Sequence, residues 1–316
     1  MCFKDLFKSI RKTKVSTSNR DKNFAENIQQ EKDIIAQMDS LKNLDYSSFK
    51  NEVKEPYKKY IGRVIAIANQ KGGVGKSTTA VNMSGYLGDL GYKTLLIDFD
   101  PQSNSTSGLG IERDNIKTSV YDIIIGNEDP RKAILRTPFK NLYIIPSSIQ
   151  LAGAEVELVS TMKREYKLKH ATDQIKDDYD FIIIDCPPAL GLLTINALTS
   201  AGEVLIPIQC EYYALEGLGQ LINTINLIKE NLNENLRITG VVMTMFDQRT
   251  RLSEQVIKEV KAYFPDKVYE TIIPRNIRLS EAPSYGKPIL EYDPDCKGAA
   301  AYKNLTKEVV GNDSAK

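Results

Sequence analysis

Residues 69–79 read NQKGGVGKSTT and stand between an apolar run, RVIAIAN at 63–69, and a helical pattern that begins near Ser77. Three glycines occupy the turn, namely Gly72, Gly73 and Gly75. Without a Cβ to obstruct it, such a turn can point successive backbone N–H groups inward around an anion. The positive end of the following helix dipole faces the same place. A strand, a glycine-rich turn and a helix in this order predict a phosphate-binding loop.

Two lysines frame these glycines. Lys76 is placed to reach the β- and γ-phosphates of a nucleotide, and the Ser77 hydroxyl is placed to ligate Mg²⁺. The usual pattern G-x-x-x-x-G-K-[ST] has glycine where this chain has Gln70. Lys71 is therefore unusual: it is either a solvated lysine at the mouth of the loop or a cation directed across a dimer interface to a partner's nucleotide. A glycine-rich turn that binds nothing is the weaker interpretation of this context.

The rest of the chain alternates short β-branched runs with helical patterns. Buried strands are expected at 63–69, 93–99, 141–146, 180–185, 203–208, 237–245 and 267–273. Helices are expected at 77–90, 160–177, 212–230, 251–264 and 297–310. Continuous apolar strands that alternate with helices are typical of a mostly parallel, doubly wound α/β sheet with helices on both faces. Residues 61–316 are expected to form this domain, and residues 1–60 a partly helical extension that need not be rigid.

Acidic residues follow two of the expected strands. DFIIIDCPP at 180–188 places Asp185 at a strand end, where open α/β sheets bind ligands. Such an aspartate typically holds Mg²⁺, often through water. KTLLIDFDPQSN at 93–104 places Asp98 and Asp100 at the end of another strand. Asp100 could orient an attacking water, whereas Asp98, on the other side of the strand, is a candidate for a structural role.

Composition narrows the class of protein. The 316 residues include 42 Lys and Arg against 41 Asp and Glu, a net charge of +1, so the chain does not coat nucleic acid by overall basicity, although a local basic patch stays possible. Four separated cysteines and a single histidine argue against a disulfide scaffold, a zinc site or an iron–sulfur cluster on this chain alone. No run approaches the roughly 20 apolar residues of a membrane-spanning helix, and no signal peptide is apparent. We expect a cytoplasmic protein.

Five segments together resemble the ParA/Soj family of partition ATPases. They are QKGGVGKSTTAVN, LLIDFDPQSNSTSGLG, FIIIDCPPALGLLTINAL, PIQCEYYALEGLGQL and IPRNIRLSEAPSYGKPI. The resemblance runs from about Arg63 to Val310 and leaves out the first 60 residues. The two-lysine loop is shared with relatives such as MinD and the nitrogenase iron protein, whereas the segments at 209–221 and 272–289 look like Soj specifically.

The resemblance implies a deviant Walker A ATPase whose cofactors are ATP and Mg²⁺ and whose hydrolysis is weak until a partner stimulates it. It implies an ATP-bound sandwich homodimer in which Lys71 contacts the partner's nucleotide and Gly72 must stay small because the subunits meet there. Lys71, Lys76 and Asp100 would support catalysis, and Ser77 and Asp185 would hold the metal. The implied nucleotide-binding residues are Lys71, Gly72, Gly73, Val74, Gly75, Lys76, Ser77 and Thr78 in the loop, with Pro274 and Asn276 at the adenine.

The resemblance also implies partners. Arg249 and Arg278 match arginines through which Soj-like dimers grip DNA without reading its sequence, so the protein would lie on the nucleoid. Dimerisation would double a small basic patch, and such binding falls steeply with salt. A surface ion pair is the alternative role for either arginine. A ParB-type centromere-binding protein with a short basic N-terminal peptide would stimulate hydrolysis. Whether the cargo is a chromosome or a plasmid is left open.

Three other functions agree less well with the sequence. A MinD-like membrane-associated positioning ATPase would need an amphipathic C-terminal helix, whereas the chain ends in KEVVGNDSAK. A metabolic reductase or ATP-dependent ligase of the same fold is opposed by the Soj-like segments, and the reductase also by the missing cluster cysteines. A transcription regulator would need a helix-turn-helix domain, for which the first 60 residues are hardly enough.

The first 14 residues, MCFKDLFKSIRKTK, carry a separate signal. Phe3, Leu6, Phe7 and Ile10 fall on one helical face, and the segment has a net charge of +4. Such a helix can lie in a membrane interface, or it can dock its apolar face on the ATPase domain or on a partner protein. We expect a weak, reversible membrane or partner anchor. A second helical stretch at 21–44 could dock or pair in the same way.

Overall fold

The computed structural model describes residues 62–211 and 217–311. The expectations for residues 1–14, for the stretch at 21–44 and for the boundary near residue 60 lie outside the described residues. Within the described ranges, no helix is long and apolar enough to cross a bilayer.

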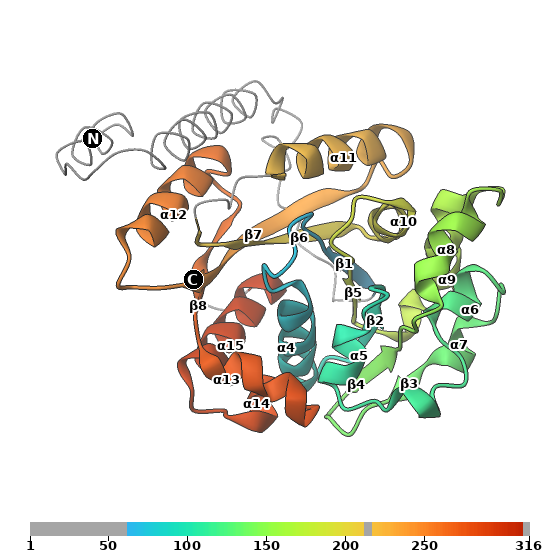
Figure 1. Cartoon of the computed structure of the whole chain (residues 1–316), viewed down its shortest axis with the longest axis horizontal. Helices are drawn as coiled ribbons and strands as arrows, with labels where there is room; N and C mark the ends of the chain where they lie inside the picture. Colours follow the sequence, from blue (N-terminus) through green and yellow to red (C-terminus); the bar gives the residue numbers. More distant parts are fainter. Residues whose placement is uncertain (1–61, 212–216, 312–316) are drawn as a thin grey trace, which may run out of the picture. The chain divides into compact units, whose positions relative to one another are not determined.

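An eight-stranded sheet forms the centre of the described structure (Figure 1). Its strands pair in parallel, except for the antiparallel pairing of β3 with β4 at one edge. Their order across the sheet is β3 (Leu135–Arg136), β4 (Leu142–Ile145), β2 (Thr94–Asp98), β5 (Phe181–Asp185), β1 (Arg63–Ile67), β6 (Glu203–Gln209), β7 (Arg237–Phe246) and β8 (Val268–Pro274). The mostly parallel α/β sheet and all seven expected strands are confirmed.

Helices cover both faces of this sheet, which explains why its strands are continuous apolar runs. On one face lie α4 (Lys76–Asp89) and α15 (Lys297–Val310), and on the other lie α10 (Leu192–Ser200), α11 (Leu218–Asn231) and α12 (Arg251–Tyr263). The expected helices 77–90, 251–264 and 297–310 are confirmed to within one residue, and the described part of the 212–230 helix begins at Leu218. Helix α10 is not among the helices predicted from the sequence.

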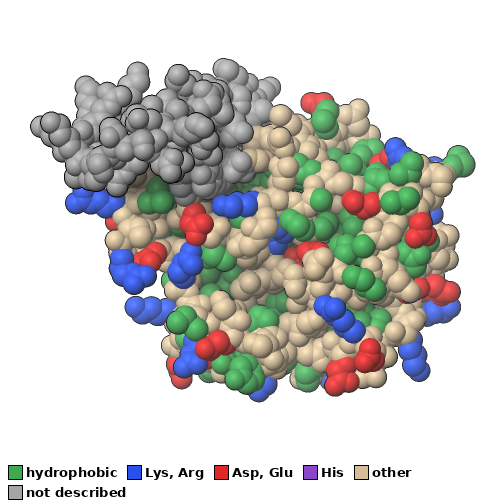
Figure 2. All heavy atoms as spheres, viewed as in Figure 1, with side chains coloured by type: hydrophobic (Ala, Val, Ile, Leu, Met, Phe, Trp, Pro, Cys, Tyr) green, Lys and Arg blue, Asp and Glu red, His purple; other side chains and the backbone are tan. Residues whose placement is uncertain are grey.

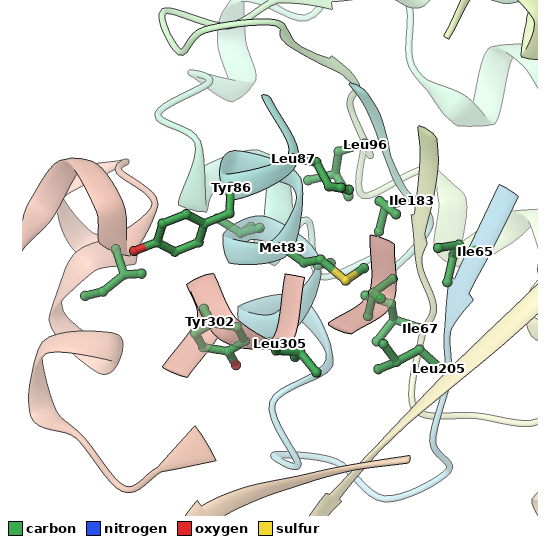
Figure 3. Packing of buried hydrophobic residues seen from close by; sticks show 14 of the residues in the cluster. Ile65, Ile67, Met83, Tyr86, Leu87, Leu96, Ile183, Leu205, Tyr302 and Leu305 are labelled. Atoms are coloured by element: carbon green, nitrogen blue, oxygen red, sulfur yellow. The ribbon is translucent and has the colours of Figure 1, made fainter. Parts of the chain in front are cut away.

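The main core lies between the sheet and the pair α4 and α15 (Figure 3). Met83 and Leu87 of α4 belong to the same buried cluster as Ile65 and Ile67 of β1, and all four side chains are fully buried. The phenol of Tyr302, which enters this apolar layer from α15, hydrogen-bonds the Thr79 hydroxyl at 3.1 Å. The polar end of a large buried side chain is thereby satisfied, and α15 is fixed to the first turn of α4.

The expected helix at 160–177 is wrong. The chain instead forms α8 (Leu151–Leu158), a 3-10 turn (Arg164–Tyr166), α9 (Lys167–Asp173) and a second 3-10 turn (Lys176–Asp178). The turn begins after Lys163, whose φ of 53° is left-handed. Only the α9 part buries a face, through Leu168, Ala171 and Thr172, so packing stabilises a helix there and not along the whole stretch.

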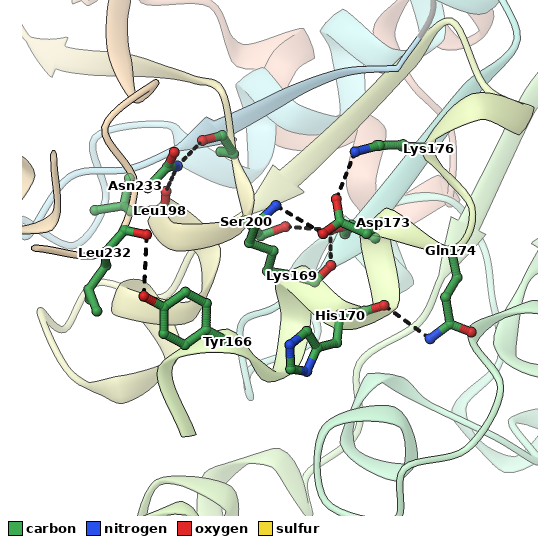
Figure 4. Close-up of polar contacts among 12 residues, drawn as sticks. Tyr166, Lys169, His170, Asp173, Gln174, Lys176, Leu198, Ser200, Leu232 and Asn233 are labelled. Carbon is green, nitrogen blue, oxygen red and sulfur yellow. Dashed lines mark hydrogen bonds and ion pairs between the residues drawn. The ribbon is translucent and has the colours of Figure 1, made fainter. Parts of the chain in front are cut away.

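Polar contacts hold α9 against its neighbours (Figure 4). The hydroxyls of Thr172 and Ser200 pair at 2.8 Å, which joins α9 to α10. The Asn233 amide donates to the carbonyls of Leu198 and Ala201 at 3.0 and 2.6 Å, which fixes the end of α11 to α10.

The remaining helices are short. They are α5 (Asn104–Gly108), α6 (Val120–Ile124), α7 (Pro130–Ala133), α13 (Ile277–Glu281) and α14 (Ile289–Tyr292), with 3-10 turns at Arg113–Asn115 and Ala282–Tyr285. Of these, α5 and α13 border the site described next.

Candidate nucleotide-binding site

The glycine-rich loop joins β1 to α4, as its sequence predicts. Gly73 and Gly75 have φ values of 74° and 90°, which are left-handed conformations that favour glycine. Gly75 stands at the N-cap of α4, and the helix begins at Lys76, one residue before the expected start. The loop thus leads into the amino end of a 14-residue helix, which is where backbone N–H groups bind anions.

Buried hydrogen bonds hold the loop on the sheet. The Thr244 hydroxyl, at the end of β7, donates to the Val74 carbonyl at 2.8 Å. The Asn69 amide donates to the Pro207 carbonyl at 2.7 Å, and its oxygen accepts from the Lys71 backbone N–H at 3.0 Å. Sequence reasoning missed Thr244, because its contact with Val74 joins residues 170 positions apart. Three neighbouring strand ends therefore position the loop.

Lys76 is the buried cation of the loop. Its ammonium donates to the Lys71 carbonyl at 3.0 Å, and the residue is only 6% exposed. Burial lowers the pKa of Lys76, while the negative charges of Asp185 and Asp100 act to raise it. A lysine held in this way would gain a strong electrostatic partner from an anion in the loop. Lys71 is partly exposed beside it.

Asp98 and Asp185 lie side by side, because they are register partners at the ends of β2 and β5. Both carboxyls are fully buried, and burial raises the pKa of each above its ordinary value. Repulsion from Asp185 raises the pKa of Asp98 further, and repulsion from Asp100 does the same for Asp185.

The two carboxyls differ in their hydrogen bonds. Asp98 accepts from the Thr106 backbone N–H at 2.7 Å, from the Thr106 hydroxyl at 2.6 Å and from the Asp100 N–H at 3.3 Å. These bonds tie the start of α5 to β2, which supports the structural role considered for Asp98. Thr106, which sequence reasoning missed, also accepts from the Ser147 N–H at 3.1 Å.

Asp185 keeps one oxygen without a partner. Its Oδ2 accepts from the Ser105 hydroxyl at 2.7 Å, and the nearby Ser77 hydroxyl acts to lower the pKa of this carboxyl. Its Oδ1 is buried and has no hydrogen-bond partner among the described residues. A buried, unpartnered carboxylate oxygen beside a hydroxyl is the kind of hard oxygen donor that Mg²⁺ prefers. The residues predicted to hold a metal, Ser77 and Asp185, therefore fit that ion.

Asp100 lies on the wall of the same site. It is 5% exposed, and its Oδ1 accepts from the Gln102 N–H at 2.9 Å. Its own carbonyl accepts from the Ser147 hydroxyl at 2.7 Å and from the Ser103 N–H at 2.9 Å. These bonds fix the backbone that carries the carboxylate.

A cavity of about 760 Å³ opens over the loop. Gly72, Gly73, Gly75, Lys76, Ser77, Thr78 and Asp100 line one part of it. Pro274, at the end of β8, and Asn276 line another part. Asn276 also caps α13, because its side-chain oxygen accepts from the Arg278 N–H at 2.8 Å. The structure thus brings the two residues predicted to hold adenine to the same cavity as the phosphate loop, across more than 190 positions of sequence.

Arg249 and Arg278 do not line the cavity, and each forms ion pairs on the surface. Arg249 donates twice to Asp247, at 2.9 and 2.6 Å, and its side chain is 85% exposed. Arg278 pairs with Glu281 at 2.9 Å and with Asp293 at 3.2 Å. The ion-pair alternative weighed for these arginines is thus realised in this structure.

The sequence of this chain is similar to those of known proteins. The family described as "AAA domain" matches residues 62–238. The sporulation initiation inhibitor protein Soj of Bacillus subtilis is 59% identical over 252 residues, which cover 80% of this chain and 100% of that protein. The chromosome partitioning protein ParA of Myxococcus xanthus is 50% identical, covering 81% and 90%.

Two solved structures are similar in fold and sequence. Cobyrinic acid a,c-diamide synthase from Mycobacterium smegmatis, with bound ADP and magnesium, has a TM-score of 0.70 and 37% identity, covering 78% of this chain and 94% of that one. The septum site-determining protein MinD from Pyrococcus horikoshii, complexed with Mg-ADP, has a TM-score of 0.65 and 28% identity, covering 78% and 95%. With a 59% identical relative covered over its whole length, this chain belongs to the ParA/Soj family of partition ATPases.

Proposed function

We propose that the protein uses ATP and Mg²⁺ to switch between a monomer and an ATP-bound sandwich dimer that binds DNA without reading its sequence. A ParB-type centromere-binding partner would stimulate hydrolysis and release the dimer. Repeated binding and release on nucleoid DNA in the cytoplasm would move a partition complex, and with it a chromosome or a plasmid. Membership of the partition ATPase family and the similarity to chromosome-partitioning relatives support this proposal.

Nucleotide binding is supported mainly by one observation: the glycine-rich loop lies next to the ends of β2 and β5, which carry Asp98 and Asp185. Lys76 offers a buried positive charge at the amino end of α4, and Asp185 offers an unpartnered oxygen beside Ser77. When bound, Mg²⁺ would neutralise charge on the phosphates, and Ser77 and Asp185 are the residues that would hold it. Pro274 and Asn276 would then bind the adenine at the far wall.

The surroundings of Gly72 support the proposed sandwich dimer. It is exposed, its φ is not left-handed, and a Cβ built on it meets no atom of the described chain within 4 Å. Nothing within the described monomer therefore requires glycine at this position. A closely approaching second subunit or its nucleotide would supply the requirement, and the neighbouring Lys71 would then contact the partner's phosphates.

Asp100 is proposed to position the attacking water. It borders the cavity, its carbonyl accepts two hydrogen bonds and its carboxylate accepts one, so the carboxylate can act from a fixed place. Replacing it should slow hydrolysis while leaving ATP binding intact. Asp100→Ala should therefore accumulate the ATP-bound dimer.

The test compares oligomeric state and binding to random duplex DNA with ATP and with ADP. Wild-type protein should form a dimer and shift DNA only with ATP, and Lys76→Ala should lose nucleotide binding. Gly72→Val should stay folded but lose both the dimer and the DNA shift. Gly202→Val is the matched control, because a Cβ at Gly202 also meets nothing within 4 Å, yet Gly202 lies at the amino end of β6, whereas Gly72 follows the carboxyl end of the parallel strand β1.

Equal DNA binding with ADP and ATP would contradict nucleotide gating. A Gly72→Val protein that still dimerises would contradict the role of Gly72, and wild-type hydrolysis by Asp100→Ala would contradict the role of Asp100. Arg249→Ala combined with Arg278→Ala should keep ATP hydrolysis and lose DNA affinity equally across sequences.

A further inference from the structure

The surroundings of Arg278 suggest how DNA affinity is set, an inference that rests on the DNA binding proposed above. Its Nη1 lies 2.9 Å from Glu281 Oε2, and its Nε lies 3.2 Å from Asp293 Oδ2. The Tyr292 hydroxyl donates to the same Glu281 oxygen at 3.0 Å. One guanidinium thus faces two carboxylates, and a phenol orients one of them.

Two other surface arginines show the same pairing. Arg249 is held by Asp247 through two hydrogen bonds, and Arg275 pairs with Glu211 at 2.7 Å. Arg249, Arg275 and Arg278 pair with four carboxylates in all. These seven side chains therefore carry a net charge of −1. Figure 2 likewise shows basic and acidic side chains interspersed over the visible face of the described residues, rather than gathered by sign.

A phosphate that approaches Arg278 must compete with these carboxylates. Glu281 stays ionised at neutral pH, because its bonds to Arg278 and Tyr292 lower its pKa. A phosphate that contacts the remaining N–H groups of the guanidinium lies close to both carboxylates, so their charges repel it as long as the two pairs stay closed. The side chains of Arg278, Glu281 and Asp293 are 53%, 38% and 31% exposed, so water and salt already weaken the pairs and exchange is feasible.

We propose that Glu281 and Asp293 form an intrachain clamp on Arg278 that competes with DNA phosphate and keeps the affinity of each subunit for DNA low. Both carboxylates are affinity-setting residues of the DNA surface, and neither touches the nucleotide cavity. A single subunit whose arginines are paired with its own carboxylates gains little binding free energy from DNA. Stable binding therefore depends on the second subunit of the dimer.

The test is a double-mutant cycle on the full chain, with binding to random duplex DNA measured in ATP at one fixed, low salt concentration. Glu281→Gln combined with Asp293→Asn keeps the shape of the clamp and removes its charge. It should tighten DNA binding about two- to tenfold, the range expected for two partly exposed ion pairs. In an Arg278→Ala background, the same pair of changes should give no more than the control's gain.

Glu291→Gln combined with Asp295→Asn is the matched control. It removes the same two charges from exposed residues that lie beside the clamp in sequence and make no ion pair among the described residues. If the control tightens binding as much as the clamp variant does, or if the clamp variant's gain survives Arg278→Ala, the effect is general charge and the inference is wrong. ATP hydrolysis without DNA should stay at the wild-type rate in both variants.

Failure of the inference and failure of the proposed function give different results. If Arg278→Ala alone leaves DNA binding unchanged, the assignment of Arg278 to DNA is wrong. If Arg278→Ala weakens binding while the clamp variant behaves like its control, the DNA contact stands and only the clamp is refuted.

Discussion

Thr106→Val tests the polar network that joins the Asp98 strand end to α5. The Thr106 hydroxyl donates to Asp98 at 2.6 Å and accepts from the Ser147 N–H at 3.1 Å, and all three residues are buried. Valine has nearly the same shape, so the change removes both bonds without opening a cavity. The backbone N–H of residue 106 still donates to Asp98.

The magnitude follows from the two bonds that are lost. Above pH 7, where the Asp98 carboxyl is ionised, a hydrogen bond to it contributes about 1.5–3 kcal/mol, and a buried donor left without a partner costs about 1–3 kcal/mol. Because the two effects share one hydroxyl, they do not add fully, and we expect the free energy of unfolding to fall by about 3 kcal/mol. Loss of one donor should also raise the pKa of Asp98 further.

Urea unfolding of nucleotide-free protein measures the effect as a lower midpoint at an unchanged m-value. Thr224→Val is the control, because the Thr224 hydroxyl donates only to the Gln220 carbonyl of its own helix and lies partly exposed. This control should change stability by less than about 0.5 kcal/mol. A Thr106→Val protein as stable as the control would refute the view that this hydroxyl holds α5 to the strand end.

Three further predictions concern packing, pH and metal. Gly88→Ala should destabilise by about 1–3 kcal/mol, because its Cβ would lie 2.2 Å from the Lys140 carbonyl oxygen. Gly153→Ala, also in a helix, meets only a flexible side-chain end at 3.3 Å and should stabilise by about 0.5–1 kcal/mol, so urea unfolding that ranks the two the other way would contradict the packing. Burial raises the pKa of Asp98 to about 7, so the folded protein holds a proton that the unfolded chain releases near its ordinary value of 3.8, and this stabilisation is lost as pH rises through 7. Between pH 5 and 8 the wild type should therefore lose stability relative to Asp98→Asn, and parallel pH curves would count against it. Asp185→Asn should abolish the additional thermal stabilisation that Mg²⁺ gives in the presence of ADP; an unchanged Mg²⁺ effect would place the metal elsewhere.

The strands were predictable because each central strand is buried on both faces and so reads as an unbroken apolar run. β5 is fully buried, for example, and its sequence FIIID carries that signal without any long-range information. β3 was not predicted, because two residues, Leu135 and Arg136, are too short to show any period. The phosphate loop was also predictable from local sequence, because its shape depends on left-handed backbone conformations that glycine favours, at Gly73 and Gly75.

Helix α5 shows where prediction from apolar periodicity fails. Its sequence is NSTSG, and the residues that it buries are Ser105, Thr106 and Gly108. The buried face of this helix carries hydroxyls that bond to carboxylates, so a search for an apolar stripe finds nothing. The available signal was different: a segment rich in serine and threonine, a few residues after a D-x-D strand end, supplies the donors that buried carboxylates need.

Consecutive residues of that run assign different roles to two similar aspartates. Thr106 donates twice to Asp98, which with the Asp100 N–H gives Asp98 three donors, whereas Ser105 donates to one oxygen of Asp185 and leaves the other without a partner. A carboxylate supplied with three donors gains little from a cation, and one with a bare buried oxygen gains much. The strand ends alone cannot distinguish the two aspartates, since both are buried register partners. The hydroxyls of α5 do so, by occupying one carboxylate and leaving its neighbour available to a metal.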